Sequence, residues 1–256
     1  MRSVFVMLGL CLTLIAATIV KSTWLPHQDP GYAAAYETWS RVIDSNPSVG
    51  EASWLRVDTG PPELRSAVAQ LLSFGPNITP FIVEQLRNEK DPLRLYRLIL
   101  LLNRVSGVNL YFDSGVENFY QAAPQFRNRF VADWDSGKYL NATESLRNRH
   151  QNSNQNQKLD RIDPKRLTEL RRYGVFAIPF IVESVERQNS PEMFAAFLII
   201  TGQSDLYADY LNNPSKQFFT RDQKLNLMKS WARENEHKLD KLNRLNDQIK
   251  AIAAKP

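Results

Sequence analysis

Apolar positions in the first third of the chain recur at helical spacing between prolines and glycines. In residues 61–74, two prolines open the segment, and Leu64, Val68 and Leu71 follow at three- and four-residue steps. This spacing places the three side chains on one face of an amphipathic helix. Gly75 comes next, and glycine commonly ends a helix in a left-handed conformation. We therefore predict a helix over residues 61–74 that stops at Gly75.

The following segments repeat the same order of signals. Thr79 precedes Pro80, so we expect Thr79 to cap a helix whose first turn contains the proline. Residues 91–107 begin with an Asp-Pro pair and end at Gly107, which again indicates a capped helix with a glycine stop. Sustained apolar–polar alternation between hairpin turns, the signal of strands, is lacking. The predicted fold is almost wholly α.

One phrase occurs twice. GPNITPFIVEQL at residues 75–86 returns 99 positions later as GVFAIPFIVESV at residues 174–185. With short gaps, Gly, Pro and Trp residues match in a common order, which apolar positions alone would not require. We therefore predict two duplicated units. The second copy offers matching helix starts at Asp163-Pro164, Ile178-Pro179 and Ser190-Pro191, and its glycine and tryptophan partners are Gly107 with Gly202 and Trp134 with Trp231.

The chain divides into five segments on these signals. They are a signal peptide or membrane anchor (1–22), a tether and N-terminal cap (23–60), a first helical unit (61–146), an Asn- and Gln-rich linker (147–160), and a second unit with a C-terminal helix (161–256).

The C-terminal part of the chain carries an apolar stripe. Residues 221–255 contain no Gly or Pro, and five apolar residues recur at three- and four-residue steps: Leu239, Leu242, Leu245, Ile249 and Ile252. This pattern predicts a long amphipathic helix. It either packs on the second unit as a terminal helix or contacts a coiled-coil partner or a membrane surface.

The N-terminal segment indicates the compartment. Residues 3–20 read SVFVMLGLCLTLIAATIV, an uncharged run of 18 residues. That length is close to the minimum for a membrane-spanning helix and long for the apolar part of a signal peptide. Both a cleaved signal and an uncleaved anchor remain open. In either case we expect a secreted or membrane-anchored protein with the bulk of the chain outside the cytoplasm.

Composition narrows the function classes. The chain has 32 Lys and Arg against 27 Asp and Glu, and the two signs are interleaved. Nucleic-acid binding usually needs a concentrated basic stripe, so we expect no nucleic-acid partner. Cys11 is the single cysteine and lies in the apolar N-terminal run. The rest of the chain therefore has no thiol for a disulfide, a zinc–thiolate site or a cysteine nucleophile.

The pattern Gly-x-x-x-x-Pro-apolar-apolar-apolar-Glu between paired helices resembles the HEAT-repeat group of α-solenoids. The segments SGVNLYFDS and TGQSDLYADYLNN, each followed by a helix with a tryptophan, are similar to the closing part of bacterial HEAT-like modules. The resemblance covers roughly residues 61–146 and 161–240. It implies an α-solenoid-like array of helical hairpins with a scaffold or partner-binding role. HEAT units span about 40 residues, so each 99-residue unit would hold two hairpins.

Motifs that carry a catalytic mechanism are missing from the sequence. It contains no glycine-rich phosphate loop, HExxH, GxSxG or EF-hand ligand series, and its three histidines lie apart from other ligand types. We predict no catalytic residue, no cofactor and no metal. Asp133 and Asp135 beside Trp134 leave one alternative, because paired carboxylates cleave glycosidic bonds. Positions i and i+2 of a helix point apart, however, which argues against this alternative.

Two sets of charged residues are candidates for binding. Glu84 and Glu183 occupy matched positions in the repeated phrase, either as ligand contacts on the second helices or as charges that stabilise a helix N-terminus. Basic residues also outnumber acidic ones between residues 126 and 172, which favours a positive surface for an anionic lipid or polymer. The candidates in that region are Arg127, Arg129, Arg166, Arg171 and Arg172.

These observations predict an extracytoplasmic HEAT-like scaffold or protein-interaction module without a catalytic site. Its partner would be a protein or another macromolecule of the cell envelope. One alternative is an envelope polysaccharide hydrolase that uses carboxylates. Another is a structural envelope protein that forms oligomers through its C-terminal helix.

Overall fold

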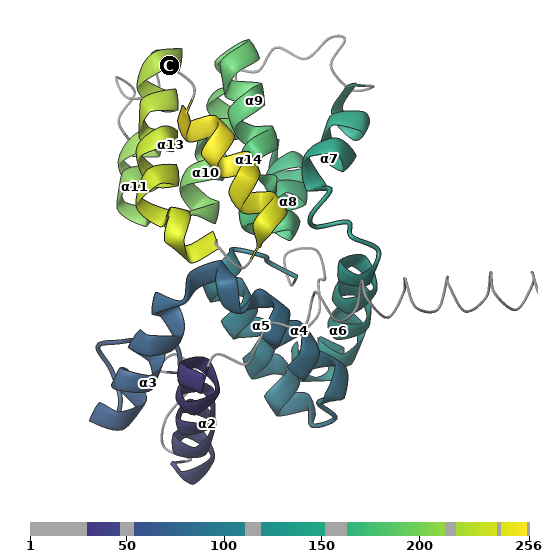
Figure 1. Ribbon diagram of the computed structural model, residues 1–256, viewed down its shortest axis with the longest axis vertical. Helices are drawn as coiled ribbons and strands as arrows, with labels where there is room; N and C mark the ends of the chain where they lie inside the picture. Colours follow the sequence, from purple (N-terminus) through teal and green to yellow (C-terminus); the bar gives the residue numbers. More distant parts are fainter. Residues whose placement is uncertain are drawn as a thin grey trace, which may run out of the picture.

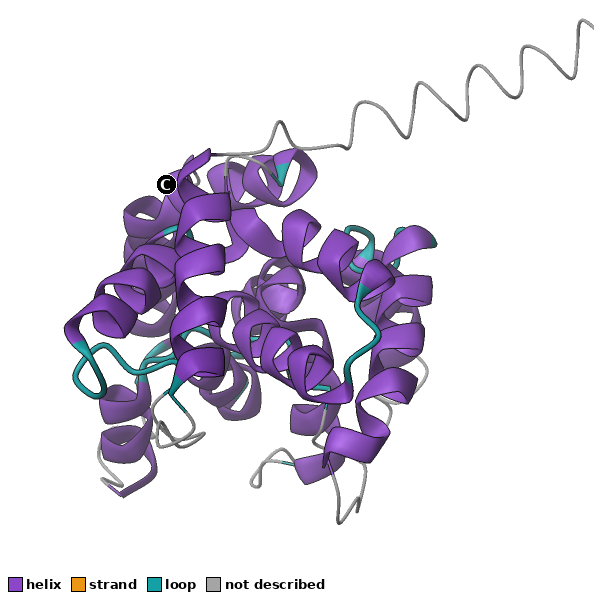
Figure 2. Ribbon diagram, turned by 90° about the horizontal axis from the view of Figure 1, so that it is seen from below, coloured by secondary structure: helices purple, strands orange, loops and turns teal. Residues whose placement is uncertain are grey.

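The computed structural model describes residues 30–46, 54–110, 119–151, 163–212, 219–239 and 242–254. Within these ranges the chain forms α-helices, short 3-10 helices and connecting loops, with no strand (Figure 2). The predicted all-α class is confirmed for this part of the chain. The predicted signal or anchor at residues 1–22 lies outside it. No helix in the described ranges combines the length and the apolar character that crossing a bilayer requires.

The first half of the chain occupies the lower part of Figure 1. Helix α2 packs along α3, and α5 contacts both α4 and α6. The bounds are α2 (Pro30–Ser45), α3 (Pro62–Ser73), η2 (Gly75–Ile78), α4 (Thr79–Asn88), α5 (Pro92–Ser106) and α6 (Phe119–Asp135).

The second half occupies the upper part of Figure 1. Helix α10 contacts α8, α9 and α11, while α13 contacts α9 and α14. The bounds are α7 (Ala142–Gln151), α8 (Pro164–Tyr173), η3 (Gly174–Ala177), α9 (Ile178–Gln188), α10 (Pro191–Ile200), α11 (Ser204–Asn212), α13 (Arg221–Asn235), η4 (Glu236–Leu239) and α14 (Asn243–Ala254).

The two halves share one order of elements. The series α3, η2, α4, α5 in the first half matches α8, η3, α9, α10 in the second. The repeated phrase begins at the glycine that opens each 3-10 helix, Gly75 in η2 and Gly174 in η3. It then runs into the helix that follows. This order is the one that duplicated units require, while the duplication and the solenoid arrangement themselves stay predictions.

Three predicted helix starts are confirmed with the side chain that caps them. Asp91 Oδ1 accepts a hydrogen bond from the Arg94 amide at 2.9 Å, and Asp163 Oδ1 accepts one from the Lys165 amide at 2.9 Å. Ser190 Oγ accepts one from the Met193 amide at 3.3 Å. Each cap satisfies an amide that the first turn of a helix leaves without a backbone partner.

The predicted cap at Thr79 is wrong. Thr79 is the first residue of α4, with φ −52° and ψ −46°, and it follows directly on the 3-10 helix η2. A capping residue needs an extended backbone at the helix entrance, and here the chain is already helical. The Thr79 hydroxyl is instead buried, and no group in the described part of the chain forms a hydrogen bond with it.

The predicted single C-terminal helix is also wrong. The helix α13 ends at Asn235, the 3-10 helix η4 follows, and α14 packs back against α13. The Arg233 Nη2 atom donates to the Ala253 carbonyl at 3.3 Å, although 20 residues of straight helix would separate the two by about 30 Å. The turn buries the whole apolar stripe inside the chain, at Leu239, Leu242, Leu245, Ile249 and Ile252.

Helix α7 runs past the predicted start of the polar linker at residue 147. Its apolar anchor is Leu146, which is fully buried. Arg147 on the next position forms an ion pair with Glu183 of α9 at 2.8 Å. These contacts hold the end of α7 on α9, which the Asn- and Gln-rich composition did not indicate. Residues 152–160 of the predicted linker lie outside the described residues.

Close backbone contacts join the two halves. The chain after α5 lies against the last turn of α8, where the Asn109 amide donates to the Arg171 carbonyl at 2.8 Å. The 3-10 helices η2 and η4 also meet, since the Asn77 side chain donates to the His237 carbonyl at 2.9 Å. A single cluster of buried apolar residues extends through both halves. The halves therefore form one packed body.

Candidate functional site

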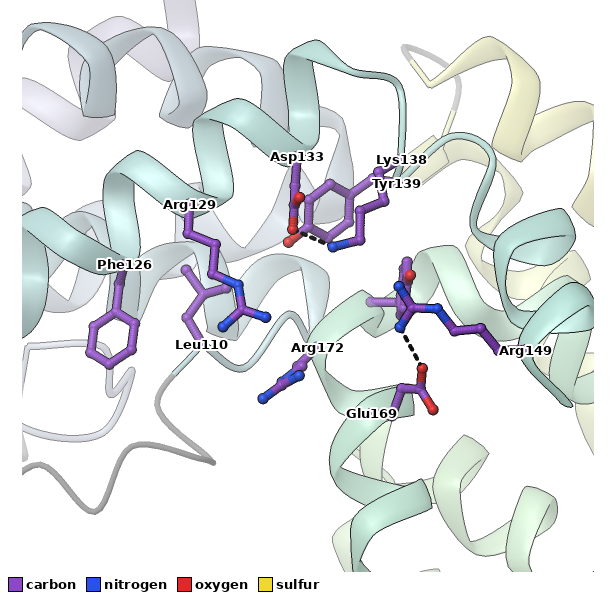
Figure 3. A pocket seen from close by; sticks show the side chains of 10 residues that line it. Leu110, Phe126, Arg129, Asp133, Lys138, Tyr139, Arg149, Glu169 and Arg172 are labelled. Atoms are coloured by element: carbon purple, nitrogen blue, oxygen red, sulfur yellow. Dashed lines mark hydrogen bonds and ion pairs between the residues drawn. The ribbon is translucent and has the colours of Figure 1, made fainter. Parts of the chain in front are cut away.

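A small pocket opens where α6, α7 and α8 approach one another. Its volume is about 70 Å³. Since one water needs about 10–15 Å³ by this measure, the pocket has room for a few waters or for one small oxyanion. Figure 3 shows the side chains around it. They are Leu110, Phe126, Arg129, Asp133, Lys138, Tyr139, Arg149, Glu169, Arg172 and Tyr173.

Helical spacing sets the two main walls. On α6, Phe126, Arg129 and Asp133 follow each other at three- and four-residue steps, which places them on one face. On α8, Glu169 lies three and four residues before Arg172 and Tyr173, so these also share a face. The turn after α6 adds Lys138 and Tyr139, and α7 adds Arg149.

Two ion pairs cross the pocket. Lys138 Nζ pairs with Asp133 Oδ2, and Arg149 Nη1 pairs with Glu169 Oε1 at 2.8 Å (Figure 3). The second pair links α7 to α8. Both carboxylates of the pocket are thus bound to cations. The arrangement is a charge network, and it differs from the two carboxylates facing each other across a cleft that the hydrolase alternative requires.

Arg129 is the least engaged cation of the pocket. It is exposed, and its side chain makes no hydrogen bond or ion pair within the described ranges. Figure 3 shows its guanidinium group reaching from α6 toward the space in front of α8, on the same side as Arg172. Arginine presents a planar fork of donors that suits a carboxylate, phosphate or sulfate group.

Tyr173 adds a buried hydroxyl. The residue is only 3% exposed, and its hydroxyl has no hydrogen-bond partner among the described residues. A buried hydroxyl without a partner is costly, and a ligand that accepts a hydrogen bond would remove this cost. Burial raises the pKa of the Tyr173 hydroxyl, which therefore keeps its proton at neutral pH and can donate it in a hydrogen bond. Lys138 Nζ lies 5.8 Å from the centre of the Tyr173 ring.

The structure places the five predicted arginines in different settings. Arg129 and Arg172 line the pocket. Arg127 turns away and donates to the Glu89 carbonyl at 2.7 Å. Arg166 is mostly buried and pairs with Glu192 at 3.3 Å. Arg171 is half-buried, and its carbonyl accepts the hydrogen bond from Asn109 that joins the halves.

The two matched glutamates also differ in their surroundings. Both oxygens of Glu183 accept from Arg147 Nη2, at 2.8 and 2.9 Å, so this residue joins α9 to α7. Glu84 is exposed and pairs at 2.8 Å with Arg87 of its own helix. Neither lies in the first turn of its helix, so stabilisation of the helix N-terminus is a weak account of both.

The aspartates beside Trp134 are separated as the helical spacing predicts. Asp133 faces the pocket and pairs with Lys138, whereas Asp135 pairs with Arg87 of α4. Sequence analysis did not single out Lys138, Glu169 or Tyr173 as site residues. The recurrence of charged positions on one face of α8 was a signal that could have indicated Glu169.

Among the described residues, no group of three or more His, Cys, Asp or Glu side chains is arranged to hold a metal ion. Comparisons with known proteins find no matching family model, no matching characterised protein and no matching solved structure.

Proposed function

We propose that the chain is a helical scaffold that holds a partner macromolecule by an anionic group bound in the α6–α7–α8 pocket. The observation that carries this proposal is Arg129, an exposed cation of the pocket that makes no hydrogen bond or ion pair within the described ranges, beside the buried hydroxyl of Tyr173. Among the described residues that line the pocket there are four cations and two acids, Arg129, Lys138, Arg149 and Arg172 with Asp133 and Glu169. Tyr173 supplies the hydroxyl.

The HEAT-like resemblance and the apolar N-terminal run complete the proposal. Repeat scaffolds of this kind present binding surfaces rather than catalytic groups. With residues 1–22 as a signal or anchor, the partner is a protein or other macromolecule of the cell envelope. N-terminal sequencing of protein purified from its native host tests the location, since a start at Met1 in a cytosolic fraction would contradict it.

Binding of radiolabelled sulfate tests the pocket directly. We expect the full-length chain, kept in non-ionic detergent at constant ionic strength, to bind one sulfate in equilibrium dialysis. Arg129→Ala should weaken binding about tenfold, because it removes a charge-assisted hydrogen bond. Tyr173→Phe should weaken it about fivefold without lowering the melting temperature, because the lost hydroxyl has no partner in the fold.

Arg65→Ala is the matched control. Arg65 is an exposed arginine on α3, so this variant changes the net charge equally without touching the pocket. It should bind sulfate like the unmodified chain. Equal binding by all four proteins, or no binding by any of them, would show that the pocket does not hold anions.

A further inference from the structure

Two shallow hollows adjoin each other at the C-terminal end of α4. Their volumes are about 560 and 330 Å³, within the range of about 300–1,000 Å³ that is common for ligand sites. Asn88 and Glu89 line both hollows, so the two form one groove, and none of its lining residues lines the α6–α7–α8 pocket. We call it the α2–α4–α6 groove. It contains Glu84 and Arg127, two of the binding candidates from the sequence.

Three helices form the walls of this groove. Tyr36 of α2 lies at one end, and the C-terminal half of α4 forms the middle. Asn128 and Asp135 of α6 lie at the other end, seven residues apart and therefore on one face of their helix. The Tyr32 hydroxyl donates to Gln85 Oε1 at 2.9 Å, which holds α2 on α4.

Most charged side chains of the groove bind other groups of the protein. Arg87 Nη1 pairs with Glu84 Oε2 at 2.8 Å, and Arg87 Nη2 pairs with Asp135 of α6. Arg127 Nη1 donates to the Glu89 carbonyl at 2.7 Å. Because these charges are already engaged within the protein, the groove suits a neutral ligand better than an ion.

Unused hydrogen-bond donors and acceptors remain along the groove. Within the described ranges, Asn88 donates through Nδ2 to Glu84 but accepts nothing at Oδ1, and Asn128 accepts at Oδ1 but donates nothing from Nδ2. In the same ranges, Glu89 uses Oε1 for two backbone amides and leaves Oε2 unused, and Lys90 leaves its ammonium group unused. The groove therefore offers donors and acceptors together.

Tyr36 adds a hydroxyl and an aromatic ring at one end of the groove. It is half-buried, and its hydroxyl makes no hydrogen bond to any described group. Burial raises the pKa of the Tyr36 hydroxyl to about 12, so at neutral pH it keeps the proton that it can donate. Its ring stacks on that of Tyr32, with centroids 6.0 Å apart, which restricts its orientation.

We propose that the α2–α4–α6 groove binds a segment of a neutral polysaccharide. Each sugar hydroxyl both donates and accepts hydrogen bonds, so it can meet the unused donors and acceptors that lie together in this groove. A neutral chain also needs no counter-charge, in keeping with the two ion pairs that Arg87 already makes. An open groove admits a chain whose ends continue beyond the protein. The proposal is independent of the α6–α7–α8 pocket.

A polypeptide suits the groove less well. Extended peptides commonly add a strand to the edge of a sheet, and the described residues form no strand. Amphipathic helices and proline-rich segments bind in grooves that are apolar or lined by aromatic rings. Among the described lining residues, only Val131, Ala132 and Tyr36 are apolar or aromatic, and the others are polar or charged.

Calorimetric titration with short sugars tests the proposal. The full-length chain, kept in a polyoxyethylene detergent without sugar headgroups, is titrated with cellotetraose, chitotetraose and maltotetraose. We expect at least one of them to bind with a dissociation constant below about 1 mM. Because salt screens charges and leaves neutral groups unaffected, raising NaCl from about 0.05 M to about 0.5 M should not weaken this binding. Sulfate should not compete, which separates this site from the α6–α7–α8 pocket.

Two variants test whether the sugar lies in the groove. Tyr36→Phe removes only the hydroxyl at one end, and Asn128→Ala removes the amide at the other end. Each should weaken binding of the tetrasaccharide about fivefold, as expected for one lost hydrogen bond, and the double variant about 25-fold, because the two residues share no partner. Asn226→Ala is the matched control, since Asn226 is an exposed asparagine on α13 outside the groove. It should bind the sugar like the unmodified chain.

Three results would overturn the proposal. Failure of all three tetrasaccharides to bind would exclude a neutral sugar chain as the ligand. Binding that Tyr36→Phe and Asn128→Ala both leave unchanged would place the sugar elsewhere on the protein. Equal displacement of the sugar by the neutral, blocked peptide Ser-Gly-Asn-Ser-Gly-Asn would indicate a polypeptide instead. Because sulfate binding is measured separately, none of these results bears on the proposed anion pocket.

Discussion

Glu192 is a carboxylate that the fold encloses almost completely. It is 2% exposed, and its cation partner within the described part of the chain is Arg166, whose Nη1 lies 3.3 Å from Oε2. The other oxygen, Oε1, is buried and has no hydrogen-bond partner in the ranges that the structure describes. Burial raises the pKa of Glu192, while the charge of Arg166 opposes that rise. Burial outweighs the ion pair because only one of the two carboxylate oxygens is engaged.

The raised pKa predicts a pH-dependent stability. Glu192 binds its proton more tightly in the folded chain than in the unfolded chain, and this difference stabilises the fold. The contribution is fully present below the unfolded pKa of 4.5 and is lost as pH rises through the folded pKa. Glu192→Gln cannot lose a proton. The free energy of unfolding of this variant, minus that of the unmodified chain, should therefore increase as pH rises from 4.5 to 7.5. Urea unfolding measures both.

The Arg166→Gln variant provides a second test of the same pH dependence. Without the guanidinium group nothing offsets burial, so the loss of stability with rising pH should become steeper than in the unmodified chain. If Glu192→Gln and the unmodified chain keep a constant difference at every pH, burial does not govern this carboxylate.

Charged residues were the least predictable part of the sequence. Arg166 and Arg172 come from the same basic stretch, yet one is enclosed with Glu192 and the other lines the pocket. Nothing local distinguishes them, because each setting depends on helices that are distant in the sequence. Caps such as Asp91 were predictable, since the donor that they bind lies within three residues.

At the scale of helices, the backbone conformation just before the first turn differs from one helix to another. Before α10 the chain is extended at Ser190, with φ −61° and ψ 120°, and the serine side chain caps the first turn. Before α4 the chain arrives as the 3-10 helix η2, so no extended residue precedes Thr79. Sequence signals of the same kind therefore mark a working cap in one place and a buried hydroxyl in the other.

Substitutions at the starts of these two helices should change the free energy of unfolding differently. Ser190→Ala removes a cap and should lower the free energy of unfolding by about 1 kcal/mol. Thr79→Val keeps the shape of the side chain and removes a buried hydroxyl that has no partner, so it should be neutral or stabilising by up to about 1 kcal/mol. Urea unfolding measures both. A loss of about 1 kcal/mol in Thr79→Val would show that this hydroxyl does support the helix.

Helix ends that depend on tertiary contacts were not predicted from the sequence. The apolar residues Leu245, Ile249 and Ile252 lie in the helix α14, as a helical stripe requires, and they pack inside the chain, which is one of the alternatives that the sequence left open; the turn back onto α13 was not predicted. A straight helix would have left that stripe without a surface to cover it, and the turn supplies α13 and α9. The pocket is similar, because the faces of α6 and α8 follow from spacing while their approach depends on the junction between the halves.

At the scale of the whole molecule, Gly174 marks the point where the two halves touch. It has a left-handed φ of 56°, and a Cβ atom there would lie 2.3 Å from the Ser106 carbonyl oxygen and 2.5 Å from the Val108 nitrogen. Both are backbone atoms, one in the last residue of α5 and one just after this helix. They cannot move aside as a flexible side chain would, so the close packing of the halves requires glycine here.

Gly174→Ala should therefore destabilise the entire chain. Backbone strain of about 1–3 kcal/mol at φ 56° and ψ −137° and backbone overlap of about 1–3 kcal/mol together predict a loss of about 2–6 kcal/mol. Gly202→Ala is the matched control, since its φ is also left-handed, at 72°, but a Cβ atom there meets nothing within 4 Å. It should lose only the free energy of the backbone strain.

Because one core extends through both halves, hydrogen exchange should accelerate in α4 as well as in α9 of Gly174→Ala. Acceleration confined to α9, or equal losses in the two variants, would show that the junction does not couple the halves.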